Sequence, residues 1–224
     1  MPSIIMGNVR SLSNKMDELA ALTRLQHEYR VCSLMCFTET WLNVATPDSV
    51  VALQGFKLVR ADRSFGESGK KKGGGLAVFI NEKWCNPAHV SVKEQLCTKD
   101  VEFIAVGIRP YYIPREFSHV ILFNVYIPPS ADAAAACERL HGAVSSMQTR
   151  YPQSLLLISG DFNHASLSPT LPTFHQYVKC HTRENRTLDL LYANVKDAYT
   201  SNPLPPSAVL ITTWCICSLN TQPR

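Results

Sequence analysis

The sequence predicts an α/β protein in which mixed or antiparallel β-sheets are covered on the outside by helices. Apolar, β-branched segments typical of buried strands outnumber the helical segments. Several of these segments follow one another with no helix between them, which argues against a plain βαβ repeat. The 224-residue chain is 46% hydrophobic and 18% charged, so it can bury a sizeable core.

The expected elements follow in order along the chain. Strands are predicted over 3–9, 31–38, 55–60, 73–80, 101–108, 119–126, 154–159, 175–180 and 187–194. A first helix is predicted from Asp17 to Tyr29, because Asn14 followed by Asp17 resembles a helix start. A second helix is predicted over 131–150, after the turn at Pro128 and Pro129.

No internal repeat or linker divides the chain, so we expect one domain over residues 1–206 and a tail of different character over residues 207–224. The longest mainly apolar stretch, Ser207 to Leu219, is too short for a membrane span. The start, MPSIIMGNVR, lacks the basic and then apolar layout of a signal peptide. We therefore expect an intracellular protein that is neither secreted nor bound to a membrane.

The net charge bears on the possible partners, and the cysteine spacing bears on disulfides and metal sites. The net charge of +4 permits a polyanionic partner without requiring one. The eight cysteines are irregularly spaced and form no C-x-x-C pair, which favours reduced thiols over disulfides or a zinc site.

Polar residues follow the ends of several strands that look buried. They are Asn8, Glu39, Tyr126, Asp161 and Asn163. Such positions are where α/β folds usually place binding sites, although a single Asn or Asp there more often closes a turn or caps a helix. The residues alone indicate a hydrolase or a phosphate-binding domain.

Six local segments sharpen this prediction. In order they are GNVRSL, FTETWL, GGGLAVFI, NVYIPP, SGDFNH and RTLDLLYANV. Together they resemble the endonuclease/exonuclease/phosphatase family, which includes DNase I, and most closely the apurinic-endonuclease-like domain of fish non-LTR retrotransposons. The resemblance covers about residues 3–206. It implies a DNase I-like, four-layer α/β sandwich of two mixed β-sheets flanked by helices.

The resemblance also implies Mg²⁺-assisted hydrolysis of a DNA phosphodiester, with Mn²⁺ as a possible substitute. Glu39 matches the metal carboxylate of the family, and Asn8 matches the residue beside it. Asp161 matches the acid that positions and deprotonates the attacking water. Asn163, two residues later, would be aimed at the same phosphate because alternate residues of an extended segment point the same way.

Further matches complete the implied site. Tyr126 matches a tyrosine that contacts the scissile phosphate, although an ordinary strand aromatic would read the same. Asp189 matches the acid that orients the catalytic histidine. Thr182 and Arg63 are predicted phosphate contacts, with a turn threonine and a solvated basic loop as the alternatives. Arg60 and residues 70–72 could add further contacts with DNA.

The sequence departs from the family at its end. The family closes with a strand that carries Ser-Asp-His, whereas this chain reads SAVLITTWCICSLNTQPR and has no histidine after His181. Synonymous codons for Val209 to Leu219 can be chosen so that the −1 frame encodes Ser-Asp-His-Asn-Leu-Val-Tyr-Leu-Gln-Pro. A frameshift after about Pro206 would therefore explain the tail. We also expect that this tail leaves one edge of a core sheet without a partner.

The implied function is nicking of target DNA to leave a 3′-hydroxyl that primes reverse transcription, impaired here by the loss of the Asp-His pair. The partner is DNA, no obligate protein partner is inferred, and the expected location is the nucleus if the chain is functional. One alternative is a catalytically dead remnant that binds nucleic acid. The other is a phosphoesterase that acts on a small phosphoester.

Overall fold

The computed structural model describes residues 1–69, 73–204 and 214–219, which contain two six-stranded sheets. The strands are β1 (Ile4–Asn8), β2 (Leu34–Thr38), β3 (Phe56–Ala61), β4 (Leu76–Asn81), β5 (Val90–Cys97), β6 (Glu102–Ile108), β7 (His119–Tyr126), β8 (Ser154–Asp161), β9 (His175–Gln176), β10 (Asp189–Ala193), β11 (Tyr199–Pro203) and β12 (Cys215–Leu219). The helices are α1 (Met16–Leu25), α2 (His27–Val31), α3 (Phe65–Ser68) and α4 (Ala133–Arg150), with 3-10 turns η1 (Ser13–Lys15), η2 (Asp48–Val51) and η3 (Pro87–His89).

Both sheets are mixed. The first has the strand order β11-β12-β1-β2-β4-β3, and the second has the order β5-β6-β7-β8-β10-β9. The pair β1 and β2 and the pair β7 and β8 are parallel, and the other neighbours are antiparallel. The predicted mixed sheets are confirmed.

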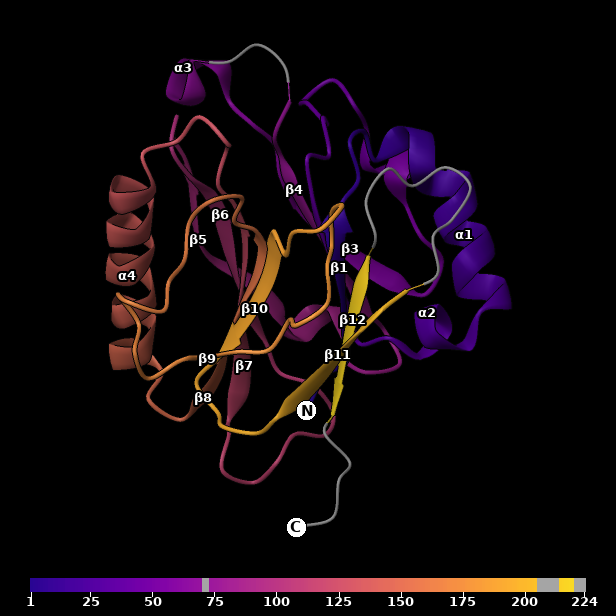
Figure 1. Cartoon of the computed structure of the whole chain (residues 1–224). Helices are drawn as coiled ribbons and strands as arrows, with labels where there is room; N and C mark the ends of the chain where they lie inside the picture. Colours follow the sequence, from indigo (N-terminus) through magenta and orange to yellow (C-terminus); the bar gives the residue numbers. More distant parts are fainter. Residues whose placement is uncertain (70–72, 205–213, 220–224) are drawn as a thin grey trace.

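Side-chain alternation along the strands builds four layers. Ile4 and Met6 of β1 join the core between the sheets, whereas Ile5 packs outward with residues of α1. In β8, Leu157 points into the same central core and Leu156 packs outward with α4. Figure 1 shows α1 and α2 on one side of the paired sheets and α4 on the other. The predicted four-layer sandwich is therefore the observed architecture.

One buried amide ties the two sheets together close to the edge where the candidate site lies. The side-chain nitrogen of Asn124, in β7, donates to the carbonyl of Phe37 in β2 at 3.0 Å and to the carbonyl of Ala77 in β4 at 3.1 Å. A buried donor without these partners would cost about 1–3 kcal/mol, so the bonds favour one fixed register between the sheets.

The helix predicted over Asp17 to Tyr29 is divided in the structure. Gln26 has an extended backbone with φ −103° and ψ 129°, and it separates α1 from α2. The break places the Tyr29 ring in the core against Trp214. No helix in the described ranges is both long and apolar enough to cross a membrane.

A strand that the sequence did not predict, β5, forms one edge of the second sheet. It carries Lys93, Glu94 and Gln95, and its pairing with β6 is irregular between Val92 and Glu94. Edge strands are often polar and bulged in this way, which hides them from a search for apolar runs.

The end of the chain corrects another expectation. Residues 215–219 form β12, which pairs with β1 on one side and β11 on the other, so the predicted unpaired edge is wrong. Trp214 packs beside Phe37, with ring centroids 4.7 Å apart. A Cβ atom on Gly7 would lie 2.3 Å from the Trp214 ring, so β1 needs a glycine at this close approach. The expected boundary after residue 206 falls outside the described residues.

Candidate active site

The strand registers bring the predicted polar residues to one edge of the sandwich. The parallel strands β1 and β2 end together, at Asn8 and directly before Glu39. In the other sheet, Tyr126 and Asp161 are register partners at the ends of β7 and β8. Asp189, at the start of β10, lies opposite Asp161. These five residues from distant parts of the chain therefore share one end of the two sheets.

Asp161 is held by donors from both sheets. The Asn8 side-chain nitrogen donates to Asp161 Oδ2 at 3.0 Å, which joins β1 to β8 directly. The backbone N–H of Asn163 donates to Asp161 Oδ1 at 3.1 Å. The Asn163 side chain instead donates to the Ile127 carbonyl at 2.7 Å. The structure thus places Asn163 beside Asp161 and uses its amide to fix the loop after β8.

The environment of Asp161 raises the pKa of its carboxyl group toward neutral pH. The residue is 2% exposed, and this burial raises its pKa to about 6, with a further contribution from the nearby Glu39 charge. The hydrogen bonds from Asn8 and Asn163 and the charge of Arg10 act in the opposite direction. A carboxylate with a pKa in this range is well suited to accept a proton from water.

Glu39 is positioned by three donors. Its Oε2 atom accepts a hydrogen bond from the Gly74 backbone N–H at 3.2 Å and another from the Trp41 indole N–H. The Tyr126 hydroxyl also bonds to Glu39, and burial together with that bond raises the pKa of Tyr126. Tyr126 therefore keeps its proton, which it donates to Glu39 in this structure.

Three consecutive glycines, Gly73–Gly75, form the loop whose backbone N–H groups bind Glu39 and the buried acid Glu102. Their φ angles of 83°, 72° and 83° lie in the left-handed region that glycine adopts without strain. The Gly75 N–H donates to Glu102 Oε2 at 2.8 Å. A Cβ atom on Gly74 would lie 2.1 Å from the Arg63 guanidinium carbon, so a side chain there would displace Arg63.

Arg63 lies under the site rather than out in solvent. Its guanidinium pairs with Glu102, its side chain is 6% exposed, and it lies 5.6 Å from the centre of the Tyr126 ring. Burial raises the pKa of Glu102, and the Arg63 charge partly opposes this. Arg63 thus supports Tyr126 in the structure, and its predicted contact with DNA phosphate stays a prediction.

Asp189 and Thr182 form a buried pair next to Asp161. The Thr182 hydroxyl oxygen accepts the N–H groups of Leu188 at 3.0 Å and Asp189 at 3.1 Å. Burial, followed by the charge of Asp161, raises the pKa of Asp189 well above its usual range. Among the described residues, Asp189 Oδ1 has no hydrogen-bond partner although it is buried. Thr182 closes the 182–189 loop here, and its predicted phosphate contact is not tested.

Arg60, another predicted DNA contact, is engaged in ion pairs with neighbouring acids. Arg60 pairs with Asp48 at 3.0 Å and with Asp62 at 2.9 Å, and residues 70–72 lie outside the described ranges. Sequence reasoning missed two other arginines, Arg183 and Arg186. They line an open hollow of about 810 Å³ that also includes Asn163.

Backbone strain marks the same edge. Seven non-glycine residues of the described chain have a left-handed φ: Arg10, Ser11, Glu39, Trp41, Asn163, Glu184 and Asp197. All except Asp197 belong to the loops that follow β1, β2 and β8 or to the loop before β10. Such strain costs about 1–3 kcal/mol per residue and concentrates at functional sites.

The site could hold a divalent metal with few protein ligands. The described residues contain no cluster of three or more His, Cys, Asp or Glu side chains that could bind a metal. Burial is the main cause of the raised pKa of Asp161, and the Glu39 charge adds a smaller contribution, so the two carboxylates lie close enough to interact. A hard cation would relieve the repulsion between them, and Mg²⁺ is often bound by one or two carboxylates while it keeps several waters. The oxygen donors present therefore fit such an ion.

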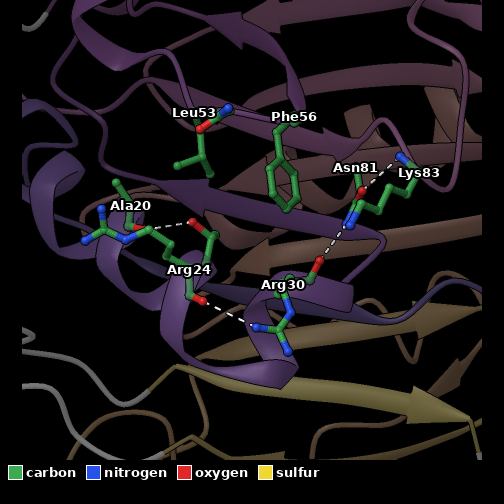
Figure 2. Close-up of a pocket in the computed structure, with 10 residues that line it drawn as sticks. Ala20, Arg24, Arg30, Leu53, Phe56, Asn81 and Lys83 are labelled. Carbon is green, nitrogen blue, oxygen red and sulfur yellow. Dashed lines mark hydrogen bonds between the residues drawn. The ribbon is translucent and has the colours of Figure 1, made fainter.

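A second cavity, of about 440 Å³, lies at the opposite end of β4 from the glycine loop. Figure 2 shows Arg24, Arg30 and Lys83 around Phe56 and Leu53. The Arg30 guanidinium donates to the Arg24 carbonyl at 3.3 Å, and the two guanidinium groups lie apart instead of converging on the cavity. The described residues that line this cavity include no carboxylate, and none of them belongs to the candidate site.

The fold is shared with known nucleases and phosphatases. No protein-family model matches the sequence, and no curated protein matches it either. The endonuclease domain of TRAS1, a telomere-specific non-LTR retrotransposon, superposes with a TM-score of 0.63 at 14% identity over 97% of each chain. The AP endonuclease LMAP from Leishmania major gives a TM-score of 0.69 at 14% identity, covering 96% of this chain and 86% of its own.

A third similar structure is the 3′ phosphatase NExo from Neisseria bound to a product DNA hairpin. It superposes with a TM-score of 0.61 at 12% identity over 98% of this chain and the whole of that one. Members of the endonuclease/exonuclease/phosphatase family from Leptotrichia buccalis and Bacteroides thetaiotaomicron are also similar, with TM-scores of 0.66. All of these similarities, at 12–14% identity, establish the fold that the sequence predicted.

Proposed function

We propose that this chain, which has the fold of the endonuclease/exonuclease/phosphatase proteins, is a divalent-metal-dependent endonuclease domain of a retrotransposon. It would nick target DNA to leave a 3′-hydroxyl that primes reverse transcription, and therefore act in the nucleus. The observation that carries the proposal is the Asn8–Asp161 hydrogen bond of 3.0 Å, which joins the two sheets beside Glu39. One amide and two carboxylates thereby meet where a phosphate could bind.

The residues divide the chemistry among them. Glu39 and the Asn8 side-chain oxygen would hold Mg²⁺ or Mn²⁺, which when bound offsets the negative charge of the phosphate. Asp161 accepts the proton of the attacking water, since its pKa of about 6 leaves it deprotonated but basic near neutral pH. The Tyr126 hydroxyl is kept protonated by burial and by its bond to Glu39, and it would donate to a phosphate oxygen by exchanging Glu39 for the substrate.

The buried oxygen of Asp189 supports the idea that a catalytic group is missing. Asp189 is the register partner of Asp161, and among the described residues its buried Oδ1 atom has no hydrogen-bond partner. An unpaired buried acceptor typically costs about 1–3 kcal/mol. The N–H of an imidazole would satisfy this atom, and the histidine of the family's closing strand is the group that this sequence lacks. We propose that the chain is consequently a weak enzyme.

Features next to the site favour DNA over a small phosphoester. The hollow beside Asn163 is open, and two arginines, Arg183 and Arg186, outnumber the one acid, Glu184, in its lining. Arginines in an open groove suit a polyanionic backbone, whereas a small substrate is usually held in an enclosed pocket. A catalytically dead remnant that only binds nucleic acid remains the second candidate, favoured by the missing histidine.

Nicking of supercoiled plasmid tests the proposal. With Mg²⁺ present we expect slow conversion to the open circle, which chelation stops and Asp161→Ala abolishes. Glu138→Gln, which changes an exposed carboxylate on α4, is the matched control and should leave the rate unchanged. Phosphate release from a small phosphomonoester without plasmid nicking would show a phosphoesterase instead. Plasmid binding with neither reaction, even at high enzyme concentration, would identify a remnant.

A further inference from the structure

Trp41 is an exposed aromatic residue that the packing of the core does not explain. It follows Glu39 by two residues, and 49% of its surface is exposed. Its backbone is left-handed, with φ 56°, a conformation that is strained for a bulky residue. Its backbone N–H is held by the Gly74 carbonyl at 2.9 Å. The fold thus fixes a strained tryptophan without burying it.

The indole connects this residue to the site. Its N–H donates to Glu39 Oε2, the same oxygen that accepts the Gly74 N–H. An indole N–H can only donate and carries no charge, so it orients the carboxylate without neutralising it. The indole is therefore anchored at one edge by Glu39 while part of its surface remains open to solvent.

On the basis of the proposed function, we propose that Trp41 stacks on a nucleobase next to the cleaved phosphate while its N–H orients Glu39. Every nucleobase has a flat face, so this contact would tolerate any sequence and would favour an unpaired or unstacked base. Within the proposed reaction, Trp41 is thus a substrate-contacting residue and a positioning residue for Glu39.

Two substitutions separate the two roles. Trp41→Phe keeps an aromatic ring and removes the N–H, so binding of DNA should be nearly unchanged while kcat falls. Trp41→Leu removes both features, so binding should also weaken by about five- to 150-fold, the range measured when stacked aromatics are truncated. Tyr112→Leu is the control, since Tyr112 is 90% exposed in the loop that joins the far ends of β6 and β7.

The measurement is binding of a short single-stranded oligodeoxynucleotide to protein that carries Asp161→Ala, so that no cleavage occurs. We follow the anisotropy of a labelled oligonucleotide and the tryptophan fluorescence of the protein. The chain has three tryptophans, and Trp214 is buried, whereas Trp41 lies half exposed at the site. Quenching on binding that disappears in Trp41→Phe, together with weakened binding in Trp41→Leu alone, supports the proposal.

Unchanged affinity in Trp41→Leu, or equal quenching before and after Trp41→Phe, would overturn it. Failure of the stacking contact can be distinguished from failure of the proposed nuclease function. Quenching by the oligonucleotide in a protein that never nicks plasmid would retain the stacking contact and reject the nuclease. Plasmid nicking with no Trp41 effect on binding or on kcat would retain the nuclease and reject the stacking contact. Circular dichroism spectra and melting curves of each variant identify any loss of folding.

Discussion

Replacing Asp161 by Asn should change how the stability of the protein depends on pH. Burial, and then the Glu39 charge, raises the pKa of Asp161 from 3.8 to about 6 in the folded protein. As the pH rises from about 4, the unfolded chain loses this proton first, so the folded state loses stability until the pH passes about 6. Asparagine carries no such proton and removes this contribution.

The size of the effect follows from the shift. A difference of about two pKa units corresponds to roughly 3 kcal/mol in full, of which about 2 kcal/mol appears between about pH 4.5 and about pH 8. The free energy of unfolding of the native chain, minus that of Asp161→Asn, should fall by this amount over the interval. Asparagine also forfeits one of the two hydrogen bonds that Asp161 accepts, but that loss is independent of pH and cancels in the comparison.

Urea unfolding at several pH values, without divalent metal, is the assay. Glu138→Gln is the matched control and should follow the native curve. The comparison is repeated in an Asp189→Asn background, because Asp161 and Asp189 influence each other. A pH dependence that is the same for the native chain and Asp161→Asn would refute the account of a buried carboxylate.

Three further substitutions test the packing and the site. Glu39→Ala should weaken Mn²⁺ binding measured by calorimetry, since fewer carboxylates lower the affinity for a hard cation; unchanged affinity would reject Glu39 as a ligand. Trp214→Ala should lower the free energy of unfolding by about 3–5 kcal/mol, and a loss below about 1 kcal/mol would show that β12 does not pack as described. Gly74→Ala should destabilise by about 1–3 kcal/mol, because φ is 72° and the Cβ atom would meet Arg63; an unchanged urea midpoint would contradict this.

The four layers were implied by the family resemblance, whereas the position of the polar residues at the strand ends was predictable for a simple physical reason. Parallel strands end at the same sheet edge, so Asn8 and Glu39, or Tyr126 and Asp161, must lie close once the strands are correct. The partner of Arg63 was not predictable, because Glu102 lies 39 residues away and the pair depends on how the two sheets face each other.

The break at Gln26 and the closing strand also escaped prediction. Both involve contacts between residues far apart in the sequence, since the Trp214 ring before β12 lies beside Tyr29 of α2 and Phe37 of β2. The role proposed for Trp41 could not be predicted from the sequence either, because its ring is exposed and belongs to no apolar pattern. No apolar pattern marks a tryptophan that contacts Glu39 and solvent instead of the core.

Restoring the closing Ser-Asp-His tests the central claim most directly. We compare nicking of supercoiled plasmid by the chain as written and by a version whose −1 frame is restored after Pro206. A missing preorganised donor costs on the order of 10²- to 10³-fold in rate, so the restored protein should nick at least about a hundredfold faster. Asp161→Ala should abolish nicking in both. Comparable rates for the two proteins, both abolished by Asp161→Ala, would contradict the claim that the histidine is missing from an otherwise assembled site.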